Sequence, residues 1–204
     1  MTETATKTTT AAETPKAIAI GRADATFSEG ERVEMRAMGL LDAEGNILQF
    51  PRAEPQVPRR AITNHGVLNE AFAYPQPSSF SRGLSVDVLP GQRILWISGT
   101  ASIDDKGASI HLGDFRAQLW RTYRNLTELV RSEGATWFDV VRTTCYLRDI
   151  ERDYDEFNRV RTLFFRCMNV EPLPASTGIQ ARLCRSELLI EIEAFAVLAD
   201  AGGR

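Results

Sequence analysis

The feature that most restricts the fold is the run LLIEIEAFAV, from Leu188 to Val197, in which two glutamates alternate with apolar residues. Successive side chains of a β-strand point to opposite faces. A strand here therefore places Glu191 and Glu193 on one face, and the aliphatic residues between them on the other. If the glutamate face is covered, desolvation raises the pKa of a carboxyl there and makes it a candidate general acid or base. The alternative is an exposed face whose glutamates pair with Arg or Lys on a neighbouring strand.

The same reading of periodicity divides the chain after Ser79 into strands and helices. The first helix is expected to begin after Asp114, a good N-cap, and to end at Gly134. The second helix is expected over residues 153–167. The expected strands cover residues 81–88, 93–98, 139–147, 176–182 and 188–197. The order ββαβαββ predicts an α+β fold with two helices on one face of a small mixed sheet, whose other face needs a partner.

The chain divides into three parts by composition. Residues 1–16 are rich in Thr and Ala without periodicity and are expected to form a disordered tail. Residues 17–71 are an accessory extension and linker, in which AIAIG is expected to form a strand. Residues 31–50 are expected to form a hairpin that turns at Asp42 to Asn46. Residues 72–200 form the main domain.

Composition excludes several classes of function. The net charge is −3, so no global basic field attracts nucleic acid. Four arginines on the first expected helix, Arg116, Arg121, Arg124 and Arg131, are explained by a solvated face. The sequence shows neither a membrane span nor a secretory signal. The three cysteines are an odd number and form no C-x-x-C motif, so no disulfide framework is expected and a reducing cytoplasm is the expected location. With two histidines and no C-x-x-C motif, neither a metal site nor a cofactor is expected.

Several motifs resemble those of the Rid family, the reactive intermediate deaminases also called YjgF-like proteins. They follow one another in the family's order and with similar spacing over residues 72–198. The matching segments are Ile97-Ser98-Gly99, Gly113-Asp114 with Gln118 and Asn125, Val141 to Asp149, Phe157-Asn158 with Phe164-Phe165, Pro174-Ala175, and Ile190 to Ala194.

The resemblance implies a chorismate-mutase-like sheet that assembles as a homotrimer around a central barrel. It also implies clefts between neighbouring subunits that bind small carboxylates. Deaminating members hydrolyse an imine or enamine there to a ketone and ammonia. The resemblance makes Glu191 the residue that handles a water or proton, and it places Gly99, Ser98 and Asn158 beside the ligand. Structural roles, at a strand end for Ser98 and on a helix surface for Asn158, are the alternatives.

Three departures from the family pattern affect this site. Ser176 stands where deaminating members have an arginine that clamps the substrate carboxylate, which places the chain in an arginine-lacking subgroup. Gly178 replaces a frequent cysteine, and Phe80 replaces an aromatic hydroxyl. Loss of the clamp removes a contact of roughly 1.5–3 kcal/mol. Ser176, Thr177 and Gly178 have little bulk, so they predict a wider cleft.

Two other arginines are candidates for the missing cation. Arg82 and Arg142 both lie near the expected cleft, and a surface position is the alternative for each.

Two function classes remain open. FSRG, WISGTASI, HLGD and PASTGIQAR are also similar to the Rid-like half of chorismatases, which hydrolyse an enol ether. The first class is therefore a hydrolase acting on an imine, enamine or enol-ether carboxylate, with Glu191 as acid/base. The second is a non-catalytic trimer that binds or senses a small carboxylate. RNA cleavage is disfavoured by the acidic charge balance.

Overall fold

The computed structural model describes residues 17–61, 72, 79, 84–86, 89, 91–104 and 107–199. Its centre is a four-stranded sheet in the order β5-β8-β6-β7. The four strands are β5 (Gln92–Ala101), β6 (Val140–Leu147), β7 (Ala175–Gln180) and β8 (Ile190–Ala199). β8 runs antiparallel to both β5 and β6, whereas β6 and β7 are parallel.

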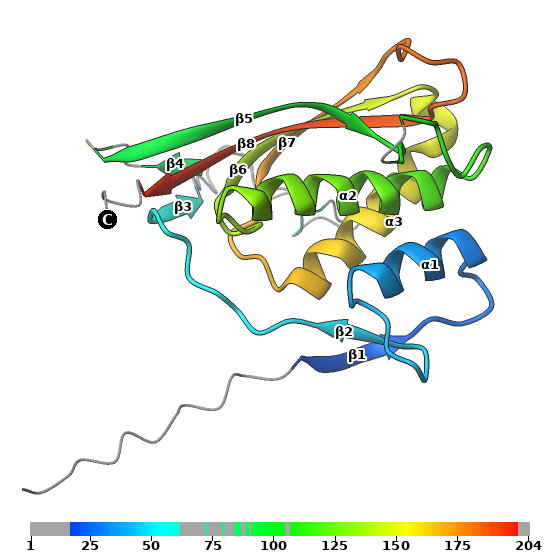
Figure 1. Cartoon of the computed structure of the whole chain (residues 1–204), viewed down its shortest axis with the longest axis horizontal. Coiled ribbons are helices and arrows are strands. Elements are labelled where there is room, and N and C mark those ends of the chain that lie inside the picture. The colour runs from blue at the N-terminus through cyan, green and yellow to red at the C-terminus, as the bar shows by residue number, and fades with distance from the viewer. Residues whose placement is uncertain are drawn as a thin grey trace, which may run out of the picture.

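The two long helices lie together on one face of this sheet (Figure 1). They are α2 (Phe115–Ser132) and α3 (Ile150–Met168). Asp114 caps α2 by accepting a hydrogen bond from the backbone N of Ala117 at 3.0 Å, as its position predicted. Gly134 follows the helix with φ of +72°, the left-handed conformation that favours glycine after a helix end. The predicted α+β class is confirmed.

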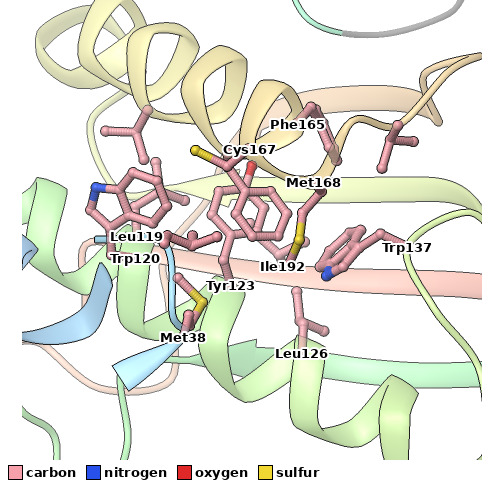
Figure 2. Packing of buried hydrophobic residues seen from close by; sticks show 14 of the residues in the cluster. Met38, Leu119, Trp120, Tyr123, Leu126, Trp137, Phe165, Cys167, Met168 and Ile192 are labelled. Atoms are coloured by element: carbon pink, nitrogen blue, oxygen red, sulfur yellow. The ribbon is translucent and has the colours of Figure 1, made fainter. Parts of the chain in front are cut away.

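An aromatic cluster fills the space between the helices and the sheet. The ring of Tyr123 on α2 stacks on Phe164 of α3, with centroids 4.1 Å apart. Trp137 meets the same phenylalanine edge-on at 4.9 Å. Figure 2 shows Ile192 reaching this cluster from the sheet. Stacked and edge-to-face rings add directional preference to burial, so they help to fix the angle between the helices.

β8 shows the expected alternation of faces. Ile190, Ile192 and Ala194 are fully buried against the helices. Glu191, Glu193 and Phe195 are only partly buried, because they lie on the face that no helix covers. We call this face of the sheet the open face.

The N-terminal extension forms a third layer beyond the helices (Figure 1). It consists of β1 (Ile18–Arg22), α1 (Glu29–Ala37) and β2 (Asn46–Gln49), with β1 and β2 antiparallel. The predicted strand in AIAIG is thus confirmed.

The hairpin predicted over residues 31–50 is wrong, because its first half is the helix α1. Ser28 and Glu31 form a capping box, in which each side chain accepts a hydrogen bond from the other's backbone N. The spacing S-x-x-E initiates helices by satisfying two backbone donors, and it starts a helix here.

The solvated arginine face predicted for α2 is also wrong. Glu34 of α1 is 1% exposed and accepts a hydrogen bond from Arg124 at 3.0 Å. The same carboxylate lies 2.8 Å from Nε2 of His111 and 3.7 Å from Arg121. The extension therefore covers this side of α2 with an opposite charge.

A second glutamate of α1 makes a similar set of contacts. Glu31 is fully buried and contacts Arg159 of α3 at 3.0 Å and Arg116 of α2 at 3.4 Å. Trp120 donates its indole N–H to this carboxylate at 3.3 Å. Of the four arginines on α2, Arg131 stays largely exposed, and its ion pair is with Glu128 on its own helix. α1 is thus tied to both long helices.

A small second sheet joins β3 (Arg59–Ala61) to β4 (Leu84–Val86) in antiparallel register. β4 lies within the strand predicted over residues 81–88. In the described residues this strand pairs with β3 and has no place in the four-stranded sheet.

Candidate functional site

Glu191 and Gly99 lie in direct contact on neighbouring strands. The β5–β8 register shifts by one residue between Ile97 and Thr100, which is a β-bulge at Ser98-Gly99. The carboxylate of Glu191 lies over Gly99 so closely that a Cβ at residue 99 would be 1.9 Å from Oε1. Glycine is therefore required here for the close approach of the glutamate side chain, and not for an unusual backbone angle.

Ser98 lies beside this contact at the bulge. It is exposed, and its backbone carbonyl accepts a hydrogen bond from the hydroxyl of Thr100 at 3.0 Å. Ser98 therefore adjoins the contact between Gly99 and Glu191, and its predicted place beside a ligand and its structural alternative at the strand end both remain open.

Tyr146 on β6 is a residue of this region that the sequence analysis missed. It lies directly opposite Glu191 in the β6–β8 register. Burial raises the pKa of the Tyr146 hydroxyl above its usual value of 10.0, and a hydrogen bond to Glu193 with the charges of Glu193 and Glu191 raises it further. The phenol therefore stays protonated at neutral pH and can donate a hydrogen bond to a carboxylate. Strand alternation in VVRTTCYL could have identified it, because Arg142 and Tyr146 share a face.

The alternative interpretation of the two glutamates requires Arg or Lys partners on a neighbouring strand. Within the described part of the chain, neither Glu191 nor Glu193 forms an ion pair with Arg or Lys. The charge of Arg142 partly opposes the rise in the pKa of Tyr146. Glu191 thus lies in a small acidic cluster on the open face.

Arg142 and Thr177 lie at the other side of the same face. Nη2 of Arg142 donates a hydrogen bond to the hydroxyl of Thr177 at 3.0 Å. Arg142 is exposed, which fits both the predicted role as a substrate cation and the alternative of a surface arginine.

Ser176 and Asn158 belong to a separate group on the helix side of β7. Ser176 is opposite Thr143 in the parallel register and accepts a hydrogen bond from its hydroxyl at 3.1 Å. The buried Arg161 of α3 donates to Ser176 at 3.1 Å and also donates to Oδ1 of Asn158. One guanidinium therefore joins two residues that the resemblance placed in the cleft.

Gly178 lies on the same side of β7 as Ser176, two residues further on. The ring of Tyr154 is 3.8 Å from the position that a Cβ of residue 178 would take. The ring therefore occupies part of the space that a larger side chain at residue 178 would fill. Phe80 and Arg82, the remaining predicted site residues, lie outside the described residues.

The two groups of residues do not meet within one subunit. Glu191 faces the open side of the sheet, whereas Ser176 faces α3. β6 also separates β8 from β7, so their backbones are about 10 Å apart at the usual strand spacing. Glu191 and Ser176 therefore do not share a site within this chain.

The residues that the structure describes contain no group of three or more His, Cys, Asp or Glu side chains placed to hold a metal ion. No helix among them is long and apolar enough to cross a membrane.

Comparison with known proteins identifies the family. The family model for Endoribonuclease L-PSP matches residues 79–198, which is more than half of the chain. The chain belongs to this family, which includes the proteins called YjgF, RutC and Rid.

The relatives in this family include named deaminases. The chain is 30% identical over 102 residues to a RutC family protein of Pyrococcus abyssi, covering 50% of this chain and 76% of the relative. It is 28% identical over 119 residues to the 2-iminobutanoate/2-iminopropanoate deaminase of Rattus norvegicus, covering 58% and 80% respectively. It is also 28% identical over 111 residues to the 3-aminoacrylate deaminase RutC of Acinetobacter baylyi, covering 54% and 84%.

A solved structure supports the same assignment. The crystal structure of YyfB from Yersinia pestis, a Rid family protein of unknown function, matches with a TM-score of 0.54 and 30% sequence identity. The match covers 69% of this chain and 98% of YyfB. The part of the chain before the family match, which includes α1, is additional to the family domain.

Proposed function

We propose that this protein is a small-molecule hydrolase that deaminates an imine or enamine carboxylate, with Glu191 as the acid/base. The observation that carries the proposal is the Glu191 carboxylate held over the Gly99 backbone, with Tyr146 opposite it. Relatives named as deaminases of 2-iminobutanoate and 3-aminoacrylate support this substrate class.

The chemistry requires a group that accepts a proton and returns it. Glu191 removes a proton from water as the water oxygen bonds to the imine carbon, and it returns that proton to the imine nitrogen, which gives a carbinolamine. The glutamate then takes the proton of the carbinolamine hydroxyl and delivers it to the amino group. The C–N bond breaks and ammonia leaves, while the hydroxyl oxygen becomes the ketone oxygen of a 2-oxo acid. Within the described residues no Arg or Lys side chain pairs with this carboxylate, so it can contact the water directly and suits this shuttle.

The proposed site lies between subunits of a homotrimer. The separation of Glu191 from Ser176 and Asn158 within one chain supports this, since a neighbouring copy can bring the two groups together. The open face also carries apolar side chains that call for a partner, including Trp96 at 72% exposure. Trp96 packs edge-on against Phe195 at 4.6 Å and extends an apolar surface along β5 and β8.

The test is hydrolysis of 2-iminobutanoate generated by an amino-acid oxidase, followed against a buffer blank. We expect the protein to accelerate the decay, and Glu191→Gln to reduce the acceleration by about 10²–10⁴-fold, the usual contribution of a general acid or base. Glu128→Gln, at an exposed surface pair of α2, is the matched control. Full activity in Glu191→Gln would refute the acid/base assignment.

Further substrates separate the related reactions. An enamine such as 3-aminoacrylate tests protonation at carbon, and chorismate tests the enol-ether reaction of the chorismatases. Binding of the product acid 2-oxobutanoate without turnover of any of the three would instead indicate the non-catalytic carboxylate-binding trimer.

A further inference from the structure

We propose that Arg161 of α3 is the positioning residue of the carboxylate-binding site, in place of an arginine at residue 176. This inference rests on the proposed function, because it names how that site holds the acid group of its substrate. The ligand class is a small 2-imino or 2-oxo carboxylate, bound at the edge strand β7 by Ser176 and Asn158.

Arg161 is an arginine held inside the protein. Its side chain is 3% exposed, and its guanidinium stacks on the ring of Phe157 with 4.4 Å between Cζ and the ring centroid. Burial of a charged group is costly, and an apolar side chain of similar volume would pack here without that cost. A guanidinium at this place therefore indicates a role for its charge and its fixed donor geometry.

The hydrogen bonds of Ser176 leave its hydroxyl proton as the group that faces a ligand. The oxygen accepts hydrogen bonds from Nη1 of Arg161 and from the hydroxyl of Thr143, each at 3.1 Å. A hydroxyl has two acceptor positions and one donor, so both acceptor positions are filled. The sulfur of Cys145 lies 3.9 Å from the same oxygen, and either atom could be the donor of that contact. Because a thiol is a weak donor and a weak acceptor, an anion would replace it as the partner of the Ser176 O–H, with a cation directly behind the hydroxyl.

Asn158 is oriented in the same way. Nη2 of Arg161 donates to Oδ1 of Asn158, which settles which end of the amide faces the guanidinium. The NH₂ group of Asn158 then points away from Arg161 and offers two donors. Asn158 and Ser176 are both partly exposed, whereas Arg161 is buried behind them.

Among the described residues, the groups that Ser176 and Asn158 offer at the edge of β7 are hydrogen-bond donors. An ionised carboxylate only accepts hydrogen bonds and carries the charge opposite to Arg161, so it fits this set. The attraction is strong because the guanidinium lies in a region of low dielectric constant. Since Arg161 acts through Ser176 and Asn158, its effect is on binding and not on the proton transfer at Glu191.

The experiment measures binding of 2-oxobutanoate by calorimetry and the KM and kcat for 2-iminobutanoate. In Arg161→Gln we expect 2-oxobutanoate to bind at least tenfold more weakly, and KM to rise with little change in kcat. Ser176→Ala removes one donor and keeps the charge, and we expect it to weaken binding by about tenfold. Arg166→Gln, an exposed arginine on the same helix, is the control and should bind as the wild type does.

A second-site variant separates positioning from a merely structural role. Arg161→Gln combined with Ser176→Arg returns a guanidinium to the edge of β7 from the strand side. We expect this double variant to recover binding of 2-oxobutanoate, which repair of packing alone would not produce. Thermal melting of each variant shows whether the protein remains folded, and Ser176→Ala tests the site even if Arg161→Gln does not fold.

The outcomes distinguish the two proposals. Wild-type binding of 2-oxobutanoate without imine turnover would refute the hydrolase and leave the carboxylate site. Turnover with an unchanged KM in Arg161→Gln and Ser176→Ala would refute the role of Arg161 and leave the hydrolase. A wild-type protein that does not bind 2-oxobutanoate would refute the carboxylate site.

Discussion

At the scale of single residues, the contact between Gly99 and Glu191 makes a sharp prediction. In Gly99→Ala the new methyl group would overlap the carboxylate, so Glu191 must rotate away from its present position. We expect kcat for imine hydrolysis to fall by about 10–100-fold, because a small displacement of a catalytic group is costly. The measurement is steady-state kinetics with thermal melting on the same samples.

The control for this substitution is another glycine in a strand. A Cβ on Gly21 of β1 would meet only the end of the Ile47 side chain, at 4.0 Å. Gly21→Ala should therefore leave kcat unchanged. If Gly99→Ala retains full activity, Glu191 does not act from the observed position.

Some residues of the candidate site could be predicted from the sequence, and others could not. Glu191 and Gly99 were identifiable because each stands in a strand motif, and the structure brings them together. Arg161 was missed because an arginine on an expected helix reads as a surface residue. Its burial depends on the loop and strand that carry Ser176 back beneath α3, which no local pattern encodes.

At the scale of elements, the docking of α1 on α2 depends on buried charges. In Glu34→Gln the guanidinium of Arg124 loses its partner at 3.0 Å while remaining partly buried. We expect the free energy of unfolding to fall by about 3 kcal/mol, since removal of one member of a buried pair leaves the other uncompensated. Urea denaturation measures this directly.

An exposed pair on the same helix supplies the comparison. Glu29 and Arg36 are 3.5 Å apart and largely solvated, so Glu29→Gln should change stability by less than about 0.5 kcal/mol. Equal effects of the two substitutions would mean that the Glu34 contacts do not hold the extension.

The elements of the family domain were largely predictable, and those of the extension were not. Helical spacing of apolar residues and an N-cap residue predict α2 and α3, and alternation of apolar residues predicts β8. α1 has only nine residues, and the acidic side chains of α1 and the arginines of α2 each resemble a solvated face when read alone. Only their pairing in space shows that they form an interface.

At the scale of the whole molecule, the open face predicts assembly. We expect light scattering to give a mass three times the 22.7 kDa of one chain. Trp96→Asp places a charge in the middle of the apolar surface and should reduce the mass and abolish turnover together. A wild-type monomer with full activity would contradict a site built from two subunits.

The glutamates of α1 also act as counter-ions that the molecule carries within itself. The family model that matches this chain is called Endoribonuclease L-PSP. A row of arginines along a helix is a typical binding surface for a polyanion such as RNA. Here Arg116, Arg121 and Arg124 already meet carboxylates of the same chain. While α1 stays docked, a phosphate backbone would have to displace Glu31 and Glu34 before it could use these cations. The extension thus neutralises the arginines of α2, so we expect anionic ligands to bind at the sheet and its edge and not on this helix.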